Sequence, residues 1–102
     1  MRDATLDDDA LMREILAALI DDTSRQMPLL EAAIQARDPS ITRRLAHYSK
    51  GACANVGARA AAAALEDLER QAARSEFVEC SVSLSRLAVE LDLLRAESIP
   101  AA

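Results

Sequence analysis

Hydrophobic residues recur along this chain at alternating steps of three and four, the spacing of one face of an α-helix. The most regular stripe comprises Phe77, Cys80, Leu84, Leu87, Leu91 and Leu94. An earlier stripe comprises Leu16, Ile20, Met27, Leu30 and Ile34, with Thr23 in the same series. The pattern predicts amphipathic helices that each have one side to bury.

Residues that start or stop helices divide the chain at Asp38-Pro39, at Gly57 and near Ser75. Asp38 can cap a helix, Pro39 is tolerated at the first helical position, and Gly57 can terminate one. We therefore predict a first helix that begins between residues 5 and 9. Three more follow, over 39 to about 56, over 58 to about 73, and one that carries the stripe from Phe77 onward.

Pro28 lies inside the first stripe. A proline removes one backbone hydrogen bond from a helix and crowds the preceding turn. We therefore expect a kink there, or a split that gives an extra N-terminal helix.

Composition narrows the fold class. The chain has 102 residues, 51% of them hydrophobic and 28% charged, with only two aromatic residues, Phe77 and Tyr48. That balance suits one soluble domain, and the abundance of alanine and leucine favours helices over strands. We predict an all-α antiparallel four-helix bundle that forms a single domain over 1–102, with a core over about 8–97 and flexible ends.

Several functional classes are disfavoured. No uncharged stretch approaches the roughly 18 residues of a membrane span, and no secretory signal is evident, so we expect a cytoplasmic location. Cys53 and Cys80 are isolated and accompany a single histidine, too few ligands for tetrahedral zinc. Both cysteines are better explained as small buried apolar groups.

Charge is unevenly distributed along the chain. The net charge is −5, yet residues 39–65 contain no aspartate or glutamate and carry Arg43, Arg44, Lys50 and Arg59. An acidic protein therefore has one basic segment, which includes the predicted second helix.

The only histidine, His47, lies in that helix. At about 100° per residue, four neighbours fall within about 60° of His47, namely Arg43, Arg44, Lys50 and Gly51. The apolar residues Ile41, Leu45, Ala52 and Val56 fall on the opposite side, which predicts that His47 is exposed to solvent.

An exposed neutral imidazole is a competent nucleophile and could accept a phosphoryl group. Lys50, one turn away, could neutralise part of the charge that the group brings. Gly51 removes a side chain at the point where a partner's catalytic cleft would have to close. Glycine inside an exposed helix costs about 1 kcal/mol relative to alanine, so its presence favours a close approach by a partner.

These residues resemble the histidine-containing phosphotransfer (HPt) domains of phosphorelays. Residues 46–51 read AHYSKG, a second glycine, Gly57, follows ten residues after His47, and Leu68-Glu69 comes further on. These features are similar to the family pattern of Ala-His-x-x-Lys-Gly with a later glycine and a Leu-Glu pair.

The resemblance implies a four-helix bundle in which His47 takes a phosphoryl group from the aspartyl phosphate of one receiver domain and passes it to another. Lys50 would support the phosphate, and Gly51 would permit docking. Beside Gly51, we take Arg43, Arg44 and Ala54 as candidates for the docking surface. It also implies receiver domains and a sensor histidine kinase as partners, no autonomous kinase activity, and no cofactor, since Mg²⁺ would come with the receiver. The chain itself lacks a glycine-rich nucleotide loop.

Other interpretations remain open at this point. A helical adaptor that binds a partner protein without catalysis would explain the bundle but not the spacing of His47, Lys50 and Gly51. Arg43 and Arg44 are also explained as solvated helix charges. A nucleic-acid site is disfavoured, because the basic face is short and offers almost no aromatic residue for stacking.

Overall fold

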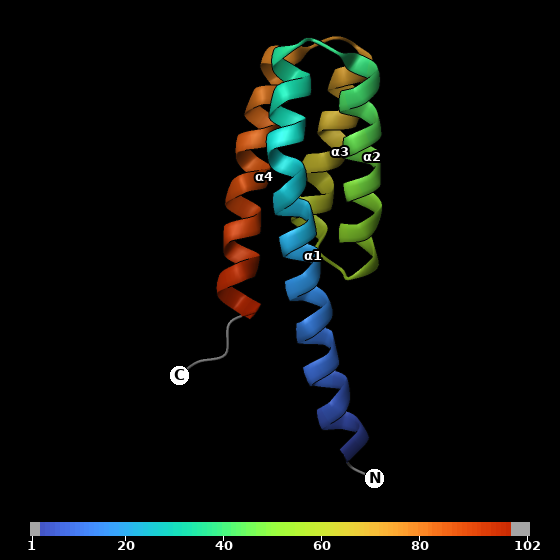
Figure 1. Cartoon of the computed structure of the whole chain (residues 1–102), viewed down its shortest axis with the longest axis vertical. Coiled ribbons are helices and arrows are strands. Elements are labelled where there is room, and N and C mark those ends of the chain that lie inside the picture. The colour runs from blue at the N-terminus through green and yellow to red at the C-terminus, as the bar shows by residue number, and fades with distance from the viewer. Residues whose placement is uncertain (1–2, 99–102) are drawn as a thin grey trace.

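Within residues 3–98, which the computed structural model describes, the chain forms four helices (Figure 1). They are α1 (Asp3–Gln35), α2 (Pro39–Asn55), α3 (Arg59–Ala73) and α4 (Phe77–Ser98). The predicted bounds of α2 and α3 are confirmed to within one residue, whereas α1 begins at Asp3, before the predicted range. The outermost residues of the predicted flexible ends, 1–2 and 99–102, lie outside the described residues.

The helices form an antiparallel bundle in which α1 packs against α2, α2 against α3, α3 against α4 and α4 against α1. Within the described residues no Cα atoms of the diagonal pairs come within 8 Å of each other, so each helix has two close neighbours and one outer side. The blue N-terminal end of α1 extends beyond the bundle in Figure 1, and the molecule measures 52 × 24 × 18 Å. The predicted four-helix bundle is confirmed.

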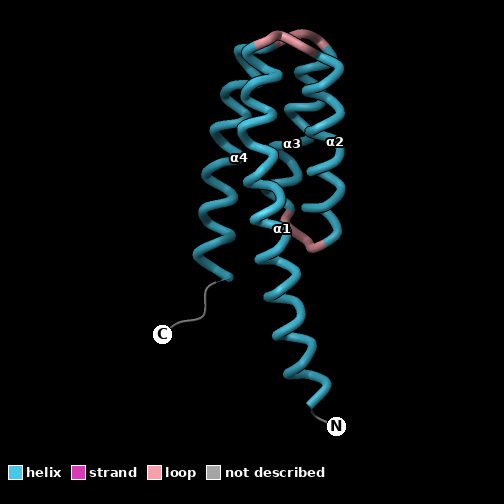
Figure 2. The backbone as a smooth tube through the Cα atoms, viewed as in Figure 1, coloured by secondary structure: helices cyan, strands magenta, loops and turns pink. Residues whose placement is uncertain are grey.

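Each of the three short loops, drawn pink in Figure 2, contains one residue in the left-handed backbone region. These are Arg37, Gly57 and Ser75, with φ of 55°, 78° and 57°. Glycine adopts this conformation without strain, and it lets the chain leave α2 and turn into α3. At the start of α2, the Asp38 Oδ1 atom accepts a hydrogen bond of 3.0 Å from the Ile41 N–H, as the predicted N-cap requires.

Pro28 lies inside α1, which continues past it as one helix (Figure 2). Of the two expected outcomes at Pro28, a kink or a split, the split into two helices, and with it the extra N-terminal helix, is therefore wrong. A proline removes only one hydrogen bond, and buried residues on both sides of it, such as Thr23 and Leu30, keep the two halves of α1 packed on the bundle.

The buried side of α2 differs from the predicted one. The predicted side was Ile41, Leu45, Ala52 and Val56, but Ile41 is exposed and the other three are only partly buried. The core side is lined by small residues instead, namely Thr42, Ala46, Ser49 and Cys53. The most apolar side of α2 is thus not its most buried side, because α2 packs closely against the alanine-rich face of α3.

The faces predicted for the first and last stripes are confirmed. In α4, Phe77, Cys80, Leu87 and Leu91 are buried, and Leu84 and Leu94 pack partly buried against them. Both cysteines are free and buried, as expected of small apolar groups, and burial raises the pKa of each thiol.

Candidate functional site

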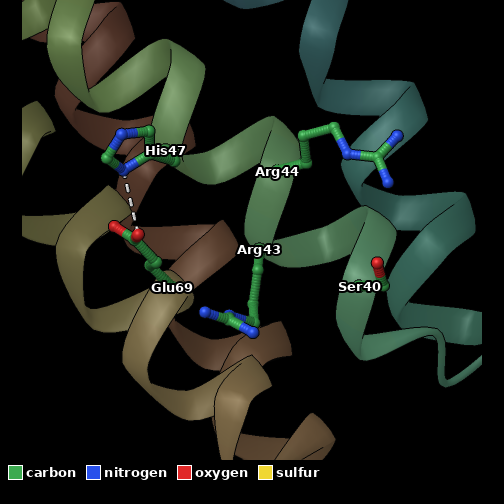
Figure 3. Close-up of a pocket in the computed structure, with 5 residues that line it drawn as sticks. All are labelled: Ser40, Arg43, Arg44, His47 and Glu69. Carbon is green, nitrogen blue, oxygen red and sulfur yellow. Dashed lines mark hydrogen bonds and ion pairs between the residues drawn. The ribbon is translucent and has the colours of Figure 1, made fainter.

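His47 projects from the outer side of α2, and 70% of its side-chain surface is exposed. The buried residues of α2 are centred about 130° around the helix from it, so the prediction of an accessible imidazole is confirmed. The ring is not free to rotate, however. Its Nδ1 atom lies 2.9 Å from the Oε2 atom of Glu69 on α3 (Figure 3).

Glu69 also binds Lys50. The Lys50 Nζ atom donates a hydrogen bond of 2.7 Å to Glu69 Oε1, while Oε2 is the atom that meets the imidazole. Lys50 and Glu69 are both partly buried, with side-chain exposures of 29% and 24%. One carboxylate therefore bridges His47 and Lys50, and it does so across the contact between α2 and α3.

The ionisation of this cluster follows from its contacts. Partial burial alone would raise the pKa of Glu69, but the hydrogen bonds from Lys50 and His47 outweigh it, so the pKa of this carboxyl is lowered. The hydrogen bond to Glu69 raises the pKa of the Lys50 ammonium. At neutral pH the pair is a carboxylate and an ammonium ion.

The charge of Glu69 determines which imidazole nitrogen is nucleophilic. An ionised carboxylate can only accept hydrogen bonds, so Nδ1 of His47 must carry the proton in this contact. In the neutral ring the lone pair then resides on Nε2. The site therefore holds an exposed imidazole whose Nδ1 is bound to Glu69, while Nε2 is available to a molecule from outside.

A shallow cavity of about 350 Å³ lies beside the imidazole (Figure 3). Its lining comprises Ser40, Arg43, Arg44, His47 and Glu69. Both arginines are exposed, and neither forms an ion pair or side-chain hydrogen bond with any described residue. The structure thus brings the predicted Arg43 and Arg44 next to His47, as two cations that are not neutralised by a carboxylate.

Gly51 and Ala54 lie on the exposed surface of α2. A Cβ atom added at Gly51 would meet no atom within 4 Å. Packing within the chain therefore does not require a glycine there, and any steric need for it must come from a molecule that approaches from outside.

The sequence patterns assign no separate role to Glu69, which enters only as part of the Leu-Glu pair of the family pattern. It lies 22 residues after His47, and no local spacing relates the two. One sequence signal could have identified it. The single Lys and the single His share one side of α2, and a carboxylate beside the buried face of α3 would be attracted to both.

Tyr48 holds α1 and α2 together at the edge of the site. Its hydroxyl donates a hydrogen bond of 3.1 Å to Asp22 Oδ2, and that bond raises the pKa of the phenol.

Across residues 3–98 there is no group of three or more histidine, cysteine or acidic side chains that could hold a metal ion. In the same range no helix is apolar over a length that would cross a bilayer.

Comparisons with known proteins identify the family of this chain. Residues 14–97 match the family model of the Hpt domain. The crystal structure of histidine-containing phosphotransfer protein B (HptB) from Pseudomonas aeruginosa PAO1 is similar, with a TM-score of 0.79 and 28% sequence identity over 84% of this chain and 75% of that one. No curated protein matches the chain. The chain belongs to the Hpt domain family and is a histidine phosphotransfer protein of phosphorelay signalling.

Proposed function

We propose that His47 is the phosphoacceptor of this chain and that Nε2 is the atom that bonds to phosphorus. The observation that carries this assignment is the contact between Nδ1 and Glu69, which leaves Nε2 as the free nitrogen of the only histidine in the chain. The donor is the aspartyl phosphate of a receiver domain, and a second receiver is the final acceptor. Sensor histidine kinases supply the phosphoryl group upstream.

The transfer needs no proton to leave the imidazole. The Nε2 lone pair attacks phosphorus in line, the bond between phosphorus and the aspartyl oxygen breaks, and the carboxylate departs with the electron pair. The ring then carries a proton on Nδ1 and the phosphoryl group on Nε2, so it has become cationic. Glu69, already in contact with Nδ1, stabilises that cation.

Lys50 and the two arginines have different parts in this proposal. Lys50 supports the charge of the phosphoryl group and also fixes Glu69, to which it is bound in the unphosphorylated protein. Arg43 and Arg44 form the docking surface with Gly51 and Ala54. The chain brings no cofactor of its own, because the receiver would hold the Mg²⁺ of the reaction in its acidic pocket. It has no autonomous kinase activity, because its sequence has no glycine-rich nucleotide loop.

The direct test is to incubate the protein with a receiver domain that carries labelled aspartyl phosphate. We expect label to appear on the protein as an acid-labile, alkali-stable phosphoramidate. Nitrogen NMR of the labelled protein should place phosphorus on Nε2. Label that resists acid, or phosphorus on Nδ1, would contradict the proposal.

Glu69→Ala is expected to slow the phosphorylation of His47 about tenfold to a hundredfold, because a hydrogen bond to a charged group contributes about 1.5–3 kcal/mol. The measurement is the single-turnover rate with phosphorylated receiver. Nitrogen NMR of the free variant should also show the proton of the neutral ring distributed over both nitrogens, an effect that a merely structural role would not produce.

Glu31→Ala is the matched control, since Glu31 is an exposed carboxylate on α1. It should keep both the rate and the tautomer of the parent protein. Equal rates for the Glu69 and Glu31 variants would show that the bridging carboxylate has no part in the reaction.

Replacing Arg43 and Arg44 together with alanine is expected to raise the KM for the phosphorylated receiver several-fold and to leave kcat nearly unchanged. Rim charges act mainly on the encounter of two proteins, so the effect of salt on kcat/KM should also weaken. Arg59→Ala, which removes an exposed arginine at the start of α3, is the control. A fall in kcat at unchanged KM would assign the arginines to the chemical step instead.

A further inference from the structure

The outer side of α4 carries a second apolar stripe that faces solvent. Its members are Val78, Val82, Val89 and Leu93, with 72, 68, 55 and 54% of their surface exposed. At about 100° per residue, this stripe lies roughly opposite the buried residues of α4, such as Cys80, Leu87 and Leu91. We call these four residues the outer stripe.

The outer stripe is continuous along the helix. At about 100° per residue its four members fall within a sector of about 60°, and the exposed Ser85 and Ala96 lie in or beside the same sector. Charged residues lie only at the margins, with Asp92 on one side and Glu79, Arg86 and Glu90 on the other. A helix that is apolar on two opposite sides is typical of one that is covered on both.

The spacing of the outer stripe along the sequence is symmetric about its midpoint. Its intervals are 4, 7 and 4 residues, and their midpoint falls between Ser85 and Arg86. An antiparallel α4 from a second copy, related by a two-fold axis at that midpoint, would place Val78 opposite Leu93 and Val82 opposite Val89. The small Ser85 side chains would meet near the axis. A two-fold interface requires a surface that is complementary to itself, and this one is.

We propose that the outer stripe is the interface of a homodimer in which two α4 helices pack antiparallel. The docking face on α2 stays open in both copies, since α2 is diagonal to α4 in the bundle. The inference does not rest on the assignment of His47.

The charges at the margin set the strength of this dimer. Glu79 of one copy would lie about 3 Å along the axis from Glu90 of the other, and each copy carries a net charge of −5. Arg86, near the axis, is already bound to Asp67 of its own copy at 2.9 Å. One helix pair also buries less than the roughly 800 Å² per partner of a standard interface. We therefore expect a dissociation constant of about 10–100 μM that falls as salt screens the carboxylates.

Sedimentation of the full chain between about 1 μM and 1 mM tests the association. The parent protein should pass from monomer to dimer over this range, and Val82→Glu should weaken dimerisation at least tenfold. Leu29→Glu, a change at an exposed leucine of α1, should leave it unchanged. A chain that stays monomeric throughout, or a dimer that salt dissociates, would overturn the proposal.

Cysteine cross-linking tests the antiparallel pairing, because Cys53 and Cys80 are buried and do not compete. On oxidation, Ser85→Cys should form a disulfide-linked dimer. Val78→Cys should not link to itself, since the two positions would lie about 22 Å apart along the axis, but it should link to Leu93→Cys in a mixture. Equal linking by Val78→Cys alone would contradict the antiparallel arrangement.

Discussion

Replacing His47 with glutamine is expected to abolish phosphoryl transfer to this protein. Glutamine is similar in length and can still reach Glu69 with its amide, but it has no nitrogen lone pair that can attack phosphorus. No second histidine exists to take over. The measurement is the labelling assay with phosphorylated receiver, in which the signal should fall to background at every time and concentration.

Tyr48→Phe is the control for the His47 variant. It changes the adjacent exposed residue and removes the hydrogen bond to Asp22, but it leaves the cluster of His47, Lys50 and Glu69 intact. This variant should be labelled at close to the parent rate. If the glutamine variant still acquires acid-labile label, another residue accepts the phosphoryl group and the assignment of His47 is wrong.

Replacing Leu68 with alanine is expected to lower the free energy of unfolding by about 2–5 kcal/mol, a large fraction of the 5–15 kcal/mol typical of a small domain. Leu68 is fully buried in the core and immediately precedes Glu69 on α3. The loss combines the transfer of the removed methyl and methine groups with the cavity that they leave. Urea unfolding followed by circular dichroism measures it as a lower midpoint.

The control for Leu68 is Leu29→Ala, which removes the same atoms from a leucine that is 53% exposed. We expect it to cost less than about 1 kcal/mol. Similar losses for the two variants would show that the α3 core position contributes no more to stability than a surface leucine.

Much of the architecture could be predicted from the sequence because it depends on local signals. The stripe of α4 repeats over six positions, and Asp38-Pro39 combines two independent helix-start signals. Each of these helix predictions therefore depends on more than one residue. The exposure of His47 was also predictable, since a basic and polar side of a helix faces solvent in any bundle. The family resemblance rests mainly on residues 46–51, which are adjacent in the sequence.

The predictions that failed depend on packing between helices. The buried side of α2 is made of Thr42, Ala46, Ser49 and Cys53, and hydrophobicity alone assigned it to larger residues. The close packing of α2 against the alanine face of α3 leaves room only for small side chains there. The sequence of α2 alone does not show this packing. The bridging role of Glu69 has the same origin, because it follows from how α3 sits against α2. The local rule that proline breaks helices predicts a split at Pro28, but it does not include the tertiary contacts that hold the two halves of α1 on the bundle.

The division of the site between two helices has a consequence for damaged or half-assembled copies of the protein. The imidazole belongs to α2 and the carboxylate that orients it belongs to α3. In a partly unfolded chain, where α2 and α3 have separated, the proton of the imidazole is no longer held on Nδ1 and the ring is no longer oriented. Such a copy would compete poorly for the phosphoryl group. Folded molecules would thus be phosphorylated in preference to partly unfolded ones, and no separate quality-control mechanism would be needed.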